Sequence, residues 1–226
     1  MIYVTGDTHA HIDIQKLNTK RFPEQKNLTK DDYLIVCGDF GLVWDESPEE
    51  RYWRLWLDKK NFTVLWVDGN HENFELLKEF PVINKFGGKV QKISDSIFHL
   101  MRGEIYTIEG KTLFCMGGAS SIDKELRVPN KSWWEEEIPS SSELNYGLNN
   151  LEKNNNEVDI ILSHCMPTSV IYKHFGKSYK NDTLTDYFDI IKSKVKYKHW
   201  YCGHYHCDEK LDDNITNLYH KVLKLE

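Results

Sequence analysis

The sequence predicts an α/β fold built on a largely parallel β-sheet. In the first third of the chain, short apolar runs alternate with segments of helical spacing, which is typical of parallel strands joined by crossover helices. Most of these apolar runs end in a glycine-containing turn that also carries a carboxylate, an amide or an imidazole. No linker-like stretch divides the 226 residues, so we expect one domain over residues 1–226.

The predicted strands and helices of the first third follow in order. Strands, dense in β-branched and aromatic residues, are predicted at 2–5, 33–37 and 63–67. Helices are predicted over about 13–17, 48–60 and 74–80. The second helix begins at Pro48 with Glu49 and Glu50 in its first turn, and the third ends before Pro81.

The middle of the chain changes character. Three short strands at 96–100, 104–108 and 111–116 predict an antiparallel meander, with turns at Arg102-Gly103 and Glu109-Gly110. An irregular stretch follows. The remaining elements are helices over about 142–155 and 183–194, strands at 158–162 and 198–202, and a closing edge strand at 217–225.

Composition and charge exclude several classes of protein. The net charge of −6 argues against an extended nucleic-acid-binding surface. No run of about eighteen apolar residues predicts a membrane span. A strand follows Met1 almost at once, so no signal peptide is expected. The five cysteines are odd in number and form no C-x-x-C pair, which favours free thiols and a cytoplasmic protein.

Side chains that can bind metal follow five of the predicted strands. They are Asp7 with His9, Asp39, Asn70 with His71, His164, and His204 with His206. Any one of them alone is compatible with a turn or capping residue, but five such coincidences at strand ends indicate a site. Because the carboxyl ends of parallel strands lie at one edge of a sheet, we expect these side chains to cluster there.

The predicted cluster has the chemistry of a two-metal centre. Neighbouring carboxylates raise one another's pKa unless a cation lies between them. Oxygen and nitrogen donors without thiolate suit Mn, Fe, Zn, Co or Ni. The donors outnumber those that one tetrahedral metal needs, and they suit two cations about 3.5–4 Å apart.

The ordered motifs Asp7-x-His9, Gly38-Asp39, Gly69-Asn70-His71-Glu72, His164 and Gly203-His204-x-His206 resemble the calcineurin-like metallophosphoesterase superfamily over residues 1 to about 208. The resemblance implies a four-layer αββα sandwich of two mixed sheets flanked by helices, in place of a simple doubly wound sheet. Segments 118–123 and 132–139 resemble small bacterial and phage members. The Gly38-Asp39-Phe40-Gly41 turn lacks the Asp-Arg-Gly of the Ser/Thr phosphoprotein phosphatases, and Ala10 stands where glycine is common.

The resemblance also implies roles for the motif residues. One cation would be held by Asp7, His9, Asp39 and His206. The second would be held by Asp39, Asn70, His164 and His204, with Asp39 shared. His71 would bind phosphate and protonate the leaving oxygen without binding metal. A water bridging the cations would act as hydroxide and attack phosphorus in line.

These roles predict a dinuclear hydrolase of a small phosphodiester or phosphomonoester, with nucleotides among the candidate substrates. One alternative is a nuclease of the same superfamily, which the acidic chain disfavours. The other is a metal-loaded scaffold without activity, which the complete set of ligands and His71 disfavours.

Substrate contacts are less defined by the sequence. Arg127 is a candidate phosphate ligand because a guanidinium matches phosphate geometry. Trp133 and Trp134 can stack on a base or aromatic leaving group, or one or both can pack against the sandwich. Glu72 either orients His71 or stabilises its turn, and the second role is favoured. The remaining tryptophans, Trp44, Trp53, Trp56 and Trp66, are expected in the core.

Overall fold

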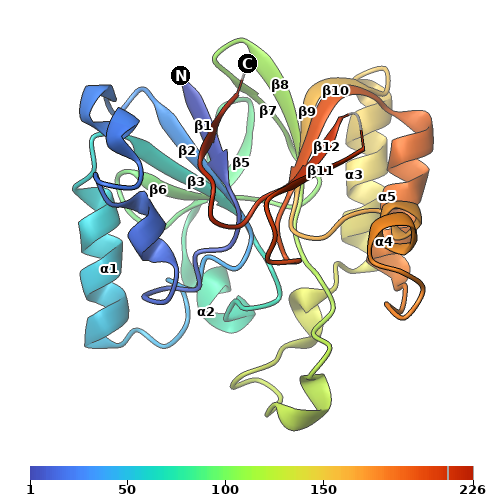
Figure 1. The fold of residues 1–226 in the computed structure, drawn as a ribbon, viewed down its shortest axis with the longest axis horizontal. Coiled ribbons are helices and arrows are strands. Elements are labelled where there is room, and N and C mark those ends of the chain that lie inside the picture. The colour runs from blue at the N-terminus through green and yellow to red at the C-terminus, as the bar shows by residue number, and fades with distance from the viewer. Residues whose placement is uncertain (213, 226) are drawn as a thin grey trace.

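Two β-sheets form the centre of the computed structural model, and helices cover their outer faces (Figure 1). The structure describes residues 1–212 and 214–225. The described residues form a seven-stranded sheet in the order β13-β1-β2-β3-β6-β5-β4 and a six-stranded sheet in the order β11-β12-β10-β9-β8-β7.

The bounds of the elements are as follows. The strands of the first sheet are β1 Ile2–Thr5, β2 Tyr33–Cys37, β3 Thr63–Val67, β4 Val82–Lys85, β5 Gly88–Lys92, β6 Ile97–Leu100 and β13 Leu223–Lys224. Those of the second are β7 Ile105–Ile108, β8 Lys111–Met116, β9 Glu157–Ser163, β10 Lys196–Cys202, β11 Glu209–Asp212 and β12 Ile215–Asn217. The α-helices are α1 Pro48–Asp58, α2 Phe74–Glu79, α3 Ser141–Lys153, α4 Thr168–His174 and α5 Thr183–Lys194.

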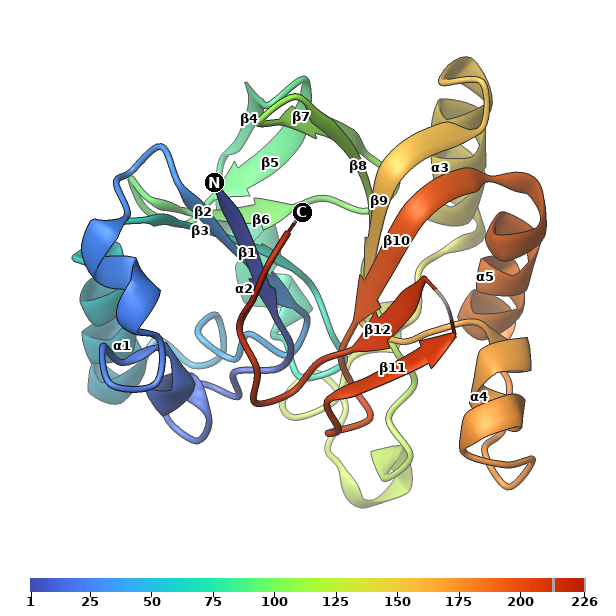
Figure 2. The same cartoon turned by 45° about the horizontal axis from the view of Figure 1, so that its top comes forward.

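Successive residues of a strand pack into different hydrophobic cores, one between the sheet and its helices and one between the two sheets. In β2, Leu34 and Val36 face the helices on the outer side, whereas Ile35 and Cys37 face the other sheet. This is the two-residue period of a strand that is buried on both faces. The second sheet behaves alike, with helices α3, α4 and α5 on its outer face (Figure 2). The predicted αββα sandwich is therefore confirmed.

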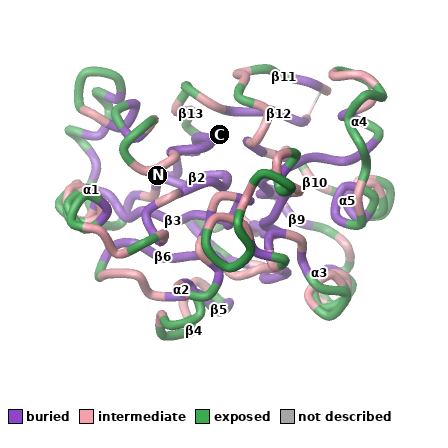
Figure 3. Tube along the Cα trace, turned by 90° about the horizontal axis from the view of Figure 1, so that it is seen from below, coloured by how far each residue is buried: buried purple, intermediate pink, exposed green. Residues whose placement is uncertain are grey.

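The parallel strands bring their carboxyl ends to one edge. Thr5 of β1 pairs with Val36 of β2, and Cys37 of β2 pairs with Val67 of β3. In the second sheet, β8, β9 and β10 are also parallel neighbours. Seen from below, the traces of β2 and β3 are largely buried, whereas much of α1 is exposed (Figure 3). The turns that leave β1, β2, β3, β9 and β10 carry the predicted ligands.

The predicted antiparallel meander at 96–116 is confirmed for its second and third strands and wrong for its first. Strand β6 lies in the first sheet, parallel to β3, while β7 and β8 form a hairpin in the second sheet. The chain crosses between the sheets at Arg102, whose buried guanidinium pairs with Asp68 at 2.6 Å. The predicted turn at Arg102-Gly103 is present, with the backbone N–H of Glu104 donating to the carbonyl oxygen of Met101 at 3.4 Å, but it connects strands of different sheets.

The predicted closing strand at 217–225 is also two separate strands. Strand β12 ends at Asn217 in the second sheet, and β13 pairs with β1 in the first. Between them the carboxylate of Asp208 accepts the backbone N–H groups of Tyr219, His220 and Lys221, which turns the chain from one sheet to the other.

Within the described residues, no helix has both the length and the apolar character that crossing a membrane requires. The cysteines are free thiols: Cys37, Cys115, Cys165 and Cys202 are buried, and Cys207 is half-buried.

Candidate metal centre

The five strand-end turns converge on one cluster. Four of the predicted ligands, His9, Asp39, His204 and His206, have positive φ angles between 40° and 70°. Non-glycine residues seldom adopt this conformation, and where they do, they often lie at functional sites. Here the conformation turns each side chain inward from the end of its strand.

Glycines next to the ligands allow the turns to approach. A Cβ atom on Gly69 would lie 2.1 Å from Oδ1 of Asp39, and one on Gly203 would lie 2.2 Å from Oδ1 of Asp7. No larger residue fits at either position without displacing a proposed ligand. The Gly-Asn-His and Gly-His-x-His motifs therefore need their first residue for close packing of the turns.

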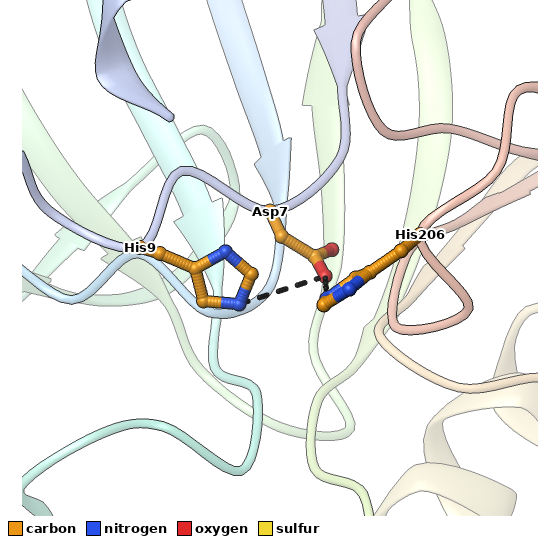
Figure 4. Close-up of side chains that lie close together, drawn as sticks. All are labelled: Asp7, His9 and His206. Atoms are coloured by element: carbon orange, nitrogen blue, oxygen red, sulfur yellow. Dashed lines mark ion pairs between the residues drawn. The ribbon is translucent and has the colours of Figure 1, made fainter. Parts of the chain in front are cut away.

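The first group of ligands contains Asp7, His9 and His206. Figure 4 shows the two imidazole rings on either side of the Asp7 carboxylate. Oδ2 of Asp7 lies 3.2 Å from Nε2 of His206 and 3.9 Å from Nε2 of His9. The same His9 nitrogen lies 3.3 Å from Oδ2 of Asp39. Carboxylate oxygens and imidazole nitrogens thus face a common point.

The second group lies on the other side of Asp39. Nε2 of His164 is 3.3 Å from Oδ1 of Asp39 and 3.2 Å from Oδ1 of Asn70. The ring of His204 lies 4.9 Å from that of His164. The two oxygens of Asp39 therefore face different groups, Oδ2 toward His9 and Oδ1 toward His164.

The residues fit divalent cations. Oδ2 of Asp7 is buried and accepts no hydrogen bond within the described part of the chain. Burial lowers the pKa of His164, but Asp39 and Asp7 outweigh this effect and raise it to about 10. The buried carboxylates thus make a strongly negative environment, and bound cations would stabilise it.

Two buried side chains hold the carboxylate turns. The ammonium of Lys16 donates to the carbonyl oxygens of Gly6, Asp7 and Tyr219. Burial lowers the pKa of Lys16 to about 8. The carboxylate of Glu72 accepts the backbone N–H of Phe40 at 2.7 Å, next to Asp39. Glu72 therefore has the favoured structural role, but the turn that it holds is that of Asp39 and not its own.

Asn70 is held by a buried chain of hydrogen bonds. Its Nδ2 donates to Oγ of Ser121 at 3.2 Å, and Ser121 donates in turn to Glu137 at 2.6 Å. The amide nitrogen is thereby occupied, and Oδ1 points toward His164. Partners of this kind fix the orientation of metal ligands.

Ser121→Ala is expected to reduce metal affinity or turnover by about 10–100-fold, since Asn70 loses the group that orients it. Metal titration and hydrolysis rates measure this effect. Ser120→Ala makes the same chemical change one residue away and should leave both properties unchanged. Equal losses in the two variants would contradict the orienting role.

His71 and Arg127 lie together beside the cluster. The terminal nitrogens of Arg127 lie 3.2 Å from Nδ1 and 3.1 Å from Nε2 of His71, so the guanidinium covers the imidazole. Asp123 holds Arg127 through its Nε at 2.8 Å. Burial lowers the pKa of His71, with Asp39 opposing and Arg127 adding to the effect.

The two tryptophans proposed as substrate contacts differ. Trp134 is 2% exposed and packs edge to face against Trp44 at 5.2 Å. It has no face free for stacking on a substrate, so the expectation is wrong for Trp134. Trp133 is half-buried, with the ammonium of Lys124 at 6.0 Å from its ring. Its contact with substrate stays a prediction.

Sequence reasoning missed Lys16, and it gave Ser121 and Glu137 no role. Lys16 lies between apolar residues of a short helical turn, and nothing in its neighbourhood distinguishes it from a surface lysine. The serine and the glutamate meet Asn70 only through the fold.

Two sheets flanked by helices, with carboxylate and imidazole side chains gathered at the ends of their parallel strands, place a candidate metal centre at one edge of the sandwich. A model of the calcineurin-like phosphoesterase family matches residues 1–208, and the chain belongs to this family. The resemblance seen in the sequence motifs is confirmed. Members of the family use divalent metals, for which the clustered groups provide candidate ligands.

Individual relatives are more distant. The chain is 26% identical over 208 residues to lariat debranching enzyme A of Xenopus laevis, a match that covers 83% of this chain but only 36% of that protein. The chain thus spans about a third of that relative's length. The crystal structure of phosphopantetheinyl hydrolase from Mycobacterium tuberculosis aligns with a TM-score of 0.47 and 16% identity, covering 96% of this chain and 87% of the other.

Proposed function

We propose that residues 1–226 act as one domain that hydrolyses small phosphate esters with two divalent cations. Asp7, His9, Asp39 and His206 would hold one cation. Asp39, Asn70, His164 and His204 would hold the other. The observation that carries this proposal is the position of Asp39, whose two oxygens lie 3.3 Å from Nε2 of His9 and 3.3 Å from Nε2 of His164.

When bound, the cations lower the pKa of a water molecule and withdraw charge from the phosphate. The chain's own residues supply the rest. Arg127 binds phosphate oxygens through a guanidinium that is already placed against His71. His71 donates a proton to the departing oxygen. Manganese, iron, zinc, nickel and cobalt all suit this set of donors.

A small ester suits the site better than a nucleic acid. The net charge of −6 gives the protein as a whole no attraction for a polyanion. The attraction for phosphate is instead local and comes from the cations and Arg127.

A panel of phosphodiesters and phosphomonoesters tests this function, with the metal-free protein reloaded separately with Mn, Fe, Zn, Ni, Co and Mg. Hydrolysis of at least one small ester is expected, and it should stop on chelation and return on reloading. Full metal occupancy without turnover of any ester would favour a non-catalytic scaffold. Turnover of oligonucleotides alone would favour a nuclease.

A further inference from the structure

A cavity of about 490 Å³ opens directly beside the proposed catalytic groups. His9, His71 and His206 line the end nearest the cluster, and Trp44 and Trp53 also line it. We call this cavity the aromatic pocket. Its volume lies within the usual range of small-molecule sites.

The walls of the aromatic pocket are preorganised by hydrogen bonds and aromatic packing. The carboxylate of Glu50 accepts the backbone N–H of Trp44 at 2.9 Å and that of Asp45 at 2.8 Å, which fixes the loop before α1. Trp53 lies on α1 itself. Tyr219 stacks on His206 with ring centroids 4.5 Å apart and an angle of 14°. Flat aromatic surfaces therefore border the ligand cluster without any rearrangement.

The permanently charged side chains that line the aromatic pocket are all acidic. Among its described lining residues there are four carboxylates, at Asp13, Asp45, Glu49 and Glu50, but no lysine or arginine. The Glu49 side chain is 62% exposed, and Oε1 of its carboxylate lies 3.8 Å from Nδ1 of His11. An anionic group in the pocket would meet carboxylates and no permanent cation from its walls.

On the basis of the proposed function, we propose that the aromatic pocket binds the departing group of the ester, and that this group is flat, aromatic and without negative charge. His71 lines the pocket. The ester oxygen of a group bound there would therefore lie within reach of His71, which protonates that oxygen as the group departs. Nucleosides and aryl alcohols, uncharged or cationic, fit this description. Polyphosphates, oligonucleotides and acidic leaving groups do not.

Matched aryl esters test the charge rule. Phenyl, 4-carboxyphenyl and 4-(aminomethyl)phenyl esters of phosphate and of methyl phosphate differ mainly in the charge of the departing group. For the carboxylated ester, kcat/KM should be about tenfold lower than for the other two, a discrimination usual for a binding pocket. Calorimetric binding of phenylphosphonate and 4-carboxyphenylphosphonate, which are not hydrolysed, should give the same order of affinity.

Two variants locate the effect in the aromatic pocket. Glu49→Lys should reduce the discrimination against the carboxylated ligands to less than about threefold, since an attractive charge replaces a repulsive one. Trp53→Ala should weaken phenylphosphonate binding about tenfold, as expected for loss of a stacking surface. Trp53→Phe is the matched control, because it keeps a flat aromatic ring at the same position of α1 and should retain most of the binding.

Equal binding and turnover of the carboxylated and neutral ligands would overturn the inference, as would unchanged discrimination in Glu49→Lys. Equal losses of binding in Trp53→Ala and Trp53→Phe would also overturn it, since the flat ring would then not be what binds the ligand. These outcomes differ from failure of the proposed function, in which no ester of any charge is hydrolysed by the metal-loaded protein.

Discussion

Asp39→Asn is expected to lose both metal and activity. Asp39 lies between the two groups of ligands, and only 2% of its surface is exposed. An amide of the same size carries no charge to offset the cations and offers only one oxygen. The metal content should fall from two ions per chain to one or none. Loss of several kcal/mol of transition-state stabilisation would lower kcat/KM about a thousandfold or more.

Elemental analysis after dialysis, together with hydrolysis rates, measures the effect of Asp39→Asn. Asp159→Asn is the matched control, because Asp159 lies in β9 away from the strand end and pairs with Lys198. It should keep its metal and its turnover. Far-UV circular dichroism checks that both variants are folded. Full metal content in folded Asp39→Asn would contradict a shared ligand.

His71→Ala is expected to separate catalysis from metal binding. His71 is not among the proposed ligands, so the metal content should match that of the unchanged protein. Loss of a general acid should lower turnover about 10²–10⁴-fold. The loss should be smallest for esters of 4-nitrophenol, since that alcohol departs readily without a proton.

The leaving-group dependence distinguishes an acid from a residue that only binds phosphate. His199→Ala is the control, because His199 lies in β10 and bonds to Thr216 outside the cluster. If His71→Ala lost metal, the residue would belong to the ligands instead. If it lowered the turnover of every ester equally, the proton-donor role would be wrong.

Much of the centre could be predicted because its residues follow apolar strands. Each buried strand is visible as a short run, such as Thr63–Val67, and the residues after it are placed by the strand itself. Parallel pairing then brings Asp7, Asp39 and Asn70 to one edge without further information.

The supporting residues could not be predicted in this way. Ser121 is 51 positions from Asn70, and Lys16 reaches a carbonyl oxygen 203 positions away in Tyr219. Such contacts depend on tertiary packing and leave no local pattern. The sequence does not predict β4 and β5, because β4 is largely exposed and β5 has a single apolar residue besides glycine, so neither shows a clear apolar alternation.

The places where the chain crosses from one sheet to the other could not be predicted from the sequence either. The short strands at 97–100 and 105–108 have the spacing of neighbours in a meander, yet they belong to different sheets. The buried pair of Arg102 with Asp68 lies at the crossing. A charged residue next to glycine is typical of a surface turn, so the sequence alone favoured the wrong path.

Anomalous diffraction from crystals grown with manganese tests the shared two-cation site most directly. Two peaks about 3.5–4 Å apart are expected, with the carboxylate of Asp39 touching both, Asp7 and His206 on one ion, and Asn70 and His164 on the other. A single peak, or two peaks too far apart for one carboxylate to reach both, would contradict the two-cation site.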